Sequence, residues 1–178
     1  MKIATLFLPL LFFSTFSFGQ WVVDKDHSKI AFIVDHHGIS EVDGYFKKFE
    51  AKITAGKADL SDAVFEVTVE TASIFTDLEE RDNELKDKDL FDVKKFPLMT
   101  FKSTSFKKVK DKQYKLIGNL TMKGVTKEVV IPFTFMKLPE KTEIKGTFTI
   151  NRRDYGVGGS SMTMADNAII SIDILLGE

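Results

Sequence analysis

Three histidines, His27, His36 and His37, are the side chains in this sequence best suited to acid–base chemistry or metal binding. His36 and His37 are neighbours in a segment that reads as a strand, so their side chains point to opposite faces and cannot hold one ion together. His27 has no partner at a metal-binding spacing, and the chain has no cysteine. We therefore predict no metal site. His36 remains a candidate polar group at a pocket, and a buried, hydrogen-bonded core histidine is the favoured alternative.

Two short clusters place arginine beside aspartate: Arg81 with Asp82, and Arg152 with Arg153 and Asp154. The planar guanidinium of arginine suits a phosphate or diphosphate group. Because each cluster carries its own carboxylate, the favoured interpretation is a set of structural ion pairs that fasten neighbouring segments. Binding of an anionic head group is the alternative.

No motif of a known enzyme class is present. The sequence contains no G-x-S-x-G elbow, no phosphate-binding P-loop and no dinucleotide fingerprint. We predict no catalytic residue and no cofactor. The competing hypothesis is an enzyme that acts on a lipid, using His36 with Asp82 or Asp154.

The elements that would position these residues are strands, because apolar and polar residues alternate through most of the chain after residue 20. In the segment 29–36, for example, Ile30, Phe32 and Val34 share one face. The same face continues on later strands with Phe49, Phe65, Val67, Phe101, Leu116, Leu120, Phe133, Phe148 and Ile172. Roughly eight strands at short spacings fit a sandwich or a barrel. Long strands, short turns and the continuous apolar face favour an all-β barrel.

An eight-stranded barrel can either fill itself with side chains or enclose one slender ligand. Gly118 and Gly146 lie on the predicted inner face, where a filled core would have a side chain. They favour a cavity, and relief of crowding where the barrel bends is the alternative. Pro132 lacks a backbone donor, so we expect it at an edge or an irregular position.

One stretch, 79–101, interrupts the strands. It begins with charged, helix-favouring residues, with Leu78 and Leu85 as sparse apolar anchors, and continues through Phe91 and Phe96 into the next strand. We predict a short helical lid over one end of the barrel.

Residues 1–19 read as an export signal, because Lys2 precedes an apolar run that ends in small residues. The run is shorter than the ~20 apolar residues that a spanning helix needs. Residues 20–178 then form one domain with a charge of 24 minus 26, or −2, which gives no support to a nucleic-acid partner. We expect an exported protein, periplasmic or secreted, without stable membrane insertion; a homodimer is compatible with this architecture.

Several ordered blocks resemble the YceI-like family of exported, lipocalin-like proteins. They are ERDNELKDKDLFDVKKFPLMTFKSTSF, YKLIGNLTMKGVTKEVVIPFTF and INRRDYGVG. The resemblance implies an antiparallel eight-stranded barrel with a helix at one end and a long apolar tunnel that binds polyisoprenoid chains or similar amphiphiles. On this basis we interpret the inner face as the tunnel lining and His36, Arg81, Asp82, Arg152 and Asp154 as its mouth. Glu84 stands where the family commonly has histidine, and Tyr155 where phenylalanine is more usual.

The leading hypothesis is non-catalytic binding of a long apolar lipid, of polyisoprenoid or quinone type, for carriage, storage or sensing. An enzyme acting on such a lipid and an interaction protein with a solid core are the alternatives.

Overall fold

The computed structural model describes residues 19–36, 40–57 and 62–177. All of the predicted export signal except Gly19 lies outside this part of the chain, and the signal stays a prediction. The described segments are β1 Gly19–Val23, β2 Lys29–His36, β3 Ser40–Phe46, β4 Phe49–Ala55, β5 Val64–Glu70, β6 Ile74–Phe75, α1 Glu79–Lys86, β7 Leu98–Lys110, β8 Gln113–Met122, β9 Val125–Lys137, β10 Lys141–Asn151 and β11 Asn167–Gly177, with short 3-10 turns η1 Lys25–His27, η2 Thr71–Ser73 and η3 Arg152–Tyr155.

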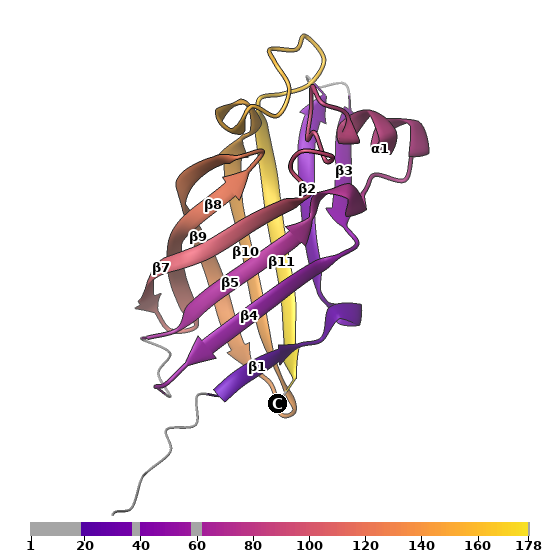
Figure 1. The fold of residues 1–178 in the computed structure, drawn as a ribbon. Helices are drawn as coiled ribbons and strands as arrows, with labels where there is room; N and C mark the ends of the chain where they lie inside the picture. Colours follow the sequence, from indigo (N-terminus) through magenta and orange to yellow (C-terminus); the bar gives the residue numbers. More distant parts are fainter. Residues whose placement is uncertain (1–18, 37–39, 58–61, 178) are drawn as a thin grey trace, which may run out of the picture.

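The sheet is a closed antiparallel barrel (Figure 1). Its order is β1-β4-β5-β7-β8-β9-β10-β11, and pairing of β11 with β1 completes the ring of eight strands. The segments β2, β3 and β6 extend strands of this ring. β2 follows β1 and pairs with the next part of β11. β3 and β6 pair with each other and so continue the paired strands β4 and β5, and β3 also pairs with β2. The predicted all-β fold, an eight-stranded antiparallel barrel with one helix, is therefore confirmed.

Side-chain hydroxyls bridge two of the interruptions between these segments. At η1, the hydroxyl of Ser28 accepts a hydrogen bond from the backbone of Leu175 at 2.9 Å. Between β3 and β4, the hydroxyl of Ser73 accepts from the backbone of Lys48 at 3.1 Å. Each hydroxyl replaces a partner that the ladder does not supply at this point, so the strands can bend here while these amides stay hydrogen-bonded.

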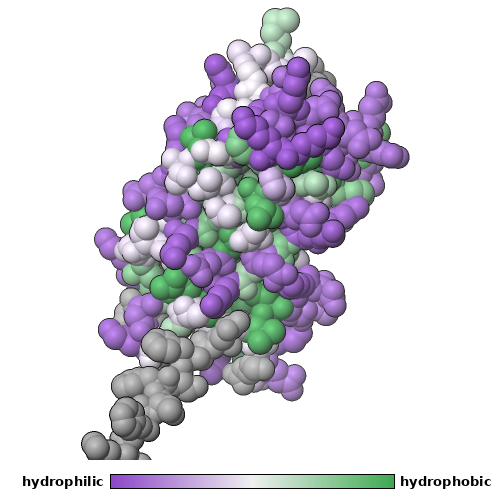
Figure 2. Space-filling view, viewed as in Figure 1, coloured by the Kyte–Doolittle hydropathy of each residue, from purple (hydrophilic) through white to green (hydrophobic). Residues whose placement is uncertain are grey.

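Alternation along each strand separates a buried inner face from a solvated outer one. Along the start of β7, for example, Met99, Phe101 and Ser103 are buried, and the residues between them are exposed. The face of the molecule seen in Figure 2 is mostly hydrophilic, with small scattered hydrophobic areas. The apolar side chains are thus directed towards the barrel axis.

Gly118 is explained by close packing within the wall and not by the cavity. A Cβ atom at this position would lie 2.5 Å from the carbonyl oxygen of Lys102 and 2.6 Å from the ring of Phe101. The β7–β8 register also shifts between Ser103 and Ser105, directly opposite Gly118. Relief of crowding at a bulge is therefore the correct interpretation here.

The wall is incomplete between β9 and β10. Their ladder begins where Lys137 pairs with Thr142 and ends where Phe133 pairs with Gly146. Both strands continue beyond this last pair towards the lid end. Pro132, which has no N–H group, is the first residue of β9 past the end of this ladder. The predicted irregular position of Pro132 is confirmed, and the missing donor gives a physical reason for the ladder to stop.

The lid covers one end of the barrel, opposite the end that carries the C-terminus (Figure 1). Leu85 of α1 faces inwards and packs against the core. Leu78 is 49% exposed, so the prediction that it anchors the helix is wrong.

Candidate ligand cavity

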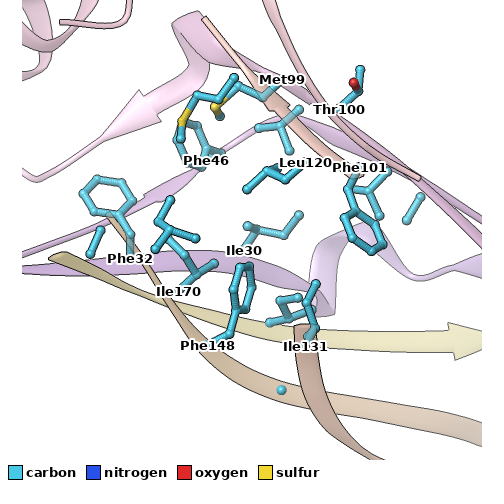
Figure 3. Close-up of a pocket in the computed structure, with 18 of the residues that line it drawn as sticks. Ile30, Phe32, Phe46, Met99, Thr100, Phe101, Leu120, Ile131, Phe148 and Ile170 are labelled. Carbon is cyan, nitrogen blue, oxygen red and sulfur yellow. The ribbon is translucent and has the colours of Figure 1, made fainter. Parts of the chain in front are cut away.

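The barrel encloses an apolar cavity of about 200 Å³. Its wall is formed by inward-facing side chains of β2, β3, β4, β5 and β7 to β11, and several of these converge on one central space in Figure 3. Of the predicted lining residues, those found in the wall are Ile30, Phe32, Val34, Phe65, Val67, Phe101, Leu116, Leu120, Phe133, Phe148 and Ile172. Phe49 is buried in the core and is not part of the cavity wall.

The lining is chemically uniform. Only Thr100 and Arg152 carry polar side-chain groups, and Thr100 lies at the margin of the space in Figure 3. The cavity surface itself is apolar throughout, because the polar atoms of both side chains point elsewhere. One water-sized group needs a cavity of about 10–15 Å³ on this scale, so a cavity of about 200 Å³ has room for several such groups in a row.

The lid end is closed by side chains from two separate segments. Leu85, Leu90 and Phe91 come from the lid, and Val157 and Met164 come from the loop after η3. Leu90, Val157 and Met164 belong to segments without strand periodicity, so the alternation pattern could not identify them. Phe91 also contacts Phe46 edge-on, with ring centroids 6.3 Å apart. The lid therefore rests directly on residues that line the cavity.

Arg152 is buried beside the cavity, with only 4% of its surface exposed. Its guanidinium donates hydrogen bonds to backbone carbonyls of the following loop, at 2.9 Å to Ala165, 2.8 Å to Val157 and 3.0 Å to Gly159. A longer contact of 3.5 Å joins it to the carboxylate of Asp166. Burial lowers the pKa of Arg152, and the nearby Asp166 opposes that effect. The side chain therefore holds the loop together, with its polar groups directed away from the cavity.

The other predicted mouth residues also make contacts within the protein. The carboxylate of Asp82 is buried and accepts hydrogen bonds from the backbone and the hydroxyl of Thr76, at 2.8 and 2.6 Å. Arg81 donates to the carbonyl of the same threonine at 2.6 Å. Asp154 forms an ion pair with Lys127 at 3.2 Å. None of these three residues is part of the cavity wall, and they stabilise the lid and the loop around it.

Lys123 joins the separate segments of the lid end. It occupies a left-handed conformation in the tight turn between β8 and β9. Its ammonium group donates hydrogen bonds to the carbonyl oxygens of Lys88 at 3.0 Å and Gly156 at 2.8 Å. One side chain thereby connects this turn to the lid and to the end of η3.

Of the three histidines, the structure describes the side chain of His27 alone. His27 is exposed and contacts Asp24 at 3.0 Å. His36 is the last residue of β2, and its side chain, like the whole of His37, lies outside the described part of the chain. Within residues 19–36, 40–57 and 62–177, no group of three or more histidine, aspartate or glutamate side chains is arranged to hold a metal ion.

No helix in the described ranges is long and apolar enough to cross a membrane.

Comparisons with known proteins agree on one family. The sequence model of the YceI-like domain matches residues 21–176. A UPF0312 protein of Pseudomonas fluorescens is 40% identical over 151 residues, which cover 78% of this chain and 76% of the relative. The crystal structure of Burkholderia cenocepacia BcnA has a TM-score of 0.81 at 25% identity, covering 86% of this chain and 98% of BcnA. A polyisoprenoid binding domain from Saccharophagus degradans has a TM-score of 0.70 over 90% of this chain and 99% of that domain; its identity is 10%, so this likeness concerns the fold alone.

Proposed function

Because this chain belongs to the YceI-like family, we propose that it binds one long apolar lipid, of the polyisoprenoid type, inside the barrel. The observation that carries this proposal is the unbroken apolar surface of the cavity. Transfer of each methylene group from water to such a surface contributes about 0.8 kcal/mol, before the entropy lost on association is subtracted. A hydrocarbon chain can therefore be held without any hydrogen bond.

The same surface favours a hydrocarbon chain over a polar ring as the enclosed part of the ligand. A quinone carbonyl or a fatty-acid carboxylate placed here would lose its hydrogen bonds to water and find no replacement, which costs several kcal/mol. The polar end of the ligand should therefore lie outside the cavity. The polyisoprenoid binding domain of Saccharophagus degradans, which shares this fold, supports an isoprenoid as the class to test first.

Binding without catalysis is the form of this function that the contacts favour. Among the described residues, the cavity wall contains no histidine and no carboxylate. Asp82 is engaged by Thr76, and Asp154 by Lys127. We propose that the protein carries, stores or senses the lipid after export, in a periplasmic or secreted setting.

The test is lipid binding by a matched pair of variants. Ile30 and Ile33 lie on the same strand and are both half-buried, but only Ile30 lines the cavity. Ile30→Trp should fill the cavity and reduce binding of geranylgeraniol at least about 10-fold, because an occupied volume is not available to a ligand. Ile33→Trp should bind as the unmodified protein does.

Native mass spectrometry and organic extraction of the purified protein complete the experiment. We expect a co-purifying lipid, or uptake of added geranylgeraniol at one molecule per chain. The proposal fails if neither is seen, or if Ile30→Trp, folded by circular dichroism, binds the lipid as well as Ile33→Trp does.

A further inference from the structure

The hairpin between β7 and β8 carries a concentration of positive charge that the cavity and the lid do not use. Its lysines are Lys107, Lys108, Lys110, Lys112 and Lys115, and all five are exposed. With Asp111 as the single acidic residue, the run 107–115 has a charge of 5 minus 1, or +4. Residues 20–178 together carry −2, so the rest of this domain carries −2 minus 4, or −6. The run 107–115, the lysine hairpin, is thus a positive patch on an otherwise negative molecule.

No neighbouring carboxylate neutralises this charge. Among the described residues, none forms an ion pair with any of the five lysines. A groove on the outer face of β8 to β11 is bordered by Lys115 and Asp173, but Asp173 is paired with Lys145 at 3.6 Å. Lys107 and Lys115 are also direct cross-strand partners, and like charges in that position repel each other. A negatively charged partner would relieve this repulsion.

Protection of an exposed edge explains only part of the lysine hairpin. The ladder between β5 and β7 ends at Lys102, so the later part of β7 has an edge that lysines can protect from pairing with other chains. Lys115, however, lies on β8 between two partners, Lys107 of β7 and Pro132 of β9. Lys112 lies in the turn itself. Neither position needs such protection, so these two lysines call for another explanation.

Aromatic packing holds the base of the hairpin in place. The ring centroids of Phe106 and Tyr114 lie 5.1 Å apart, and Phe65 stacks on Phe106 at 6.1 Å. Phe133 contacts all three rings, with centroid distances from 5.5 to 6.0 Å. The lysines beyond this cluster are therefore presented on a fixed support, which lowers the ordering cost when they meet a partner.

An exposed apolar residue, Val109, lies in the middle of the lysines. Its chain neighbours are Lys108 and Lys110, and 54% of its surface is exposed. Of the five lysines only Lys115 borders the groove, so a small anion in the groove would leave the other four without a partner. An extended lipid surface fits all of them, since head groups can meet the ammonium groups while the valine reaches the apolar boundary below.

The charge is distributed so that the hairpin would reach an anionic surface first. The lid segment 77–95 contains eight acidic and five basic residues, which gives 5 minus 8, or −3. The ten residues of β8 run from the hairpin to the turn whose Lys123 contacts the lid, and the two ends of such a strand lie about 30 Å apart. The β7–β8 hairpin and α1 are accordingly well separated in Figure 1. This field orients the molecule with the hairpin towards negative charge and the lid away from it.

We propose that the lysine hairpin docks this protein reversibly on an anionic lipid surface, with the ammonium groups at the lipid head groups and Val109 at the edge of the acyl region. The inference goes beyond the proposed function and rests on it in one respect. A protein that takes up a lipid must meet a membrane, which favours a lipid surface over a soluble acidic polymer. Docking itself does not require the cavity to be occupied.

Vesicle co-sedimentation tests the docking. The chain from Gln20, which lacks the apolar run of the predicted export signal, is mixed with vesicles of phosphatidylcholine and phosphatidylglycerol in equal parts, or of phosphatidylcholine alone. Each lysine near an anionic surface adds a factor of about 5 in affinity, so binding should be at least about 10-fold tighter to the mixed vesicles. High salt should remove most of that difference, because exposed charges are screened.

Two double variants with the same change of charge locate the contact. Lys108→Gln with Lys110→Gln should lower the affinity for the mixed vesicles about 10-fold or more. Lys88→Gln with Lys94→Gln is the matched control, because both lysines are exposed and belong to the lid. The control should bind within about 2-fold of the unmodified chain, since charges far from the surface are screened.

A pair of valine variants separates a lipid surface from a soluble polyanion. Val109→Ser should weaken binding to the mixed vesicles about 3-fold, the contribution of roughly one buried methylene group. Val125→Ser, in an exposed position beside the turn that contacts the lid, should leave binding unchanged. Only a partner with an apolar layer gives this difference.

Each remaining outcome decides against a specific statement. Equal binding to the two kinds of vesicle, or binding that Lys108→Gln with Lys110→Gln retains, overturns the docking site. Binding to soluble polyglutamate that is as tight as to the mixed vesicles, and that Val109→Ser leaves unchanged, would assign the hairpin to an acidic polymer instead. Ile30→Trp, with its cavity filled, should dock as the unmodified chain does. A failure of docking is therefore distinguishable from a failure of lipid binding in the cavity.

Discussion

Arg152 stabilises the lid end through hydrogen bonds that no other residue type can reproduce. Its guanidinium donates in several directions to carbonyls of a loop that otherwise contains little regular structure. Two residues of that loop, Val157 and Met164, line the cavity. The position of the apolar wall here therefore depends on a buried cation.

We expect Arg152→Met to lower the free energy of unfolding by about 2–4 kcal/mol. Methionine can fill much of the volume, but the carbonyl oxygens of Val157, Gly159 and Ala165 would lose their donor, and the carbonyl of the buried Val157 would be left unsatisfied. Denaturant unfolding measures the loss, and hydrogen exchange across residues 156–166 should increase more than across the strands.

Arg153→Met is the matched control. Arg153 is 45% exposed and contacts Asp166 at 3.0 Å, so its removal should cost less than about 1 kcal/mol. If the two variants lose the same stability, Arg152 does not have the proposed structural role.

At the residue scale, the sequence predicted which side chains lie in the cavity wall better than it predicted which side chains contact each other. Period-two alternation places inner-face residues such as Phe32 and Leu116 reliably, because the direction of a strand side chain follows from its place in the count. The roles of Arg81 and Asp82 depend on Thr76, a residue that no motif singles out. Neighbours in space that come from unrelated segments leave no local signature.

At the scale of elements, the bulge between β7 and β8 controls how the wall bends. Gly118 lies opposite the register shift, and the neighbouring Phe101 ring and Lys102 carbonyl occupy the space that a side chain would need. The register shift itself could not be predicted, because it depends on how two strands pair. The strands could be predicted, and so could the helix Glu79–Lys86, since both follow from composition and periodicity along a single segment.

Gly118→Ala tests whether this close approach is essential. The added methyl group would meet backbone, which cannot move aside as a flexible side chain can, so we expect a loss of about 1–3 kcal/mol or more. Thermal unfolding gives the comparison with Gly159→Ala, where the new atom would have no neighbour within 4 Å. Equal stabilities for the two variants would show that the wall adjusts freely at the bulge.

At the scale of the whole molecule, closure joins the first strand to the last. β1 pairs with both β11 and β4, and Trp21 contacts Phe135 of β9 edge-on, with centroids 6.1 Å apart. The continuous apolar face predicts a barrel. It does not predict which strands pair to close the barrel, because closure joins residues more than 150 positions apart, such as Val22 and Gly177.

A chain that begins at Asp24 should therefore open at this seam, whereas one that begins at Gln20 should not. Without β1, the ends of β4 and β11 become unpaired edges and the apolar interior meets water. We expect a loss of at least about 3 kcal/mol, the scale of removing one large aromatic side chain from a core. Exposed edges should also promote self-association. Guanidinium unfolding, binding of the dye ANS and light scattering report the three effects, and a chain from Asp24 that matches the longer one in all of them would show that β1 is dispensable for closure.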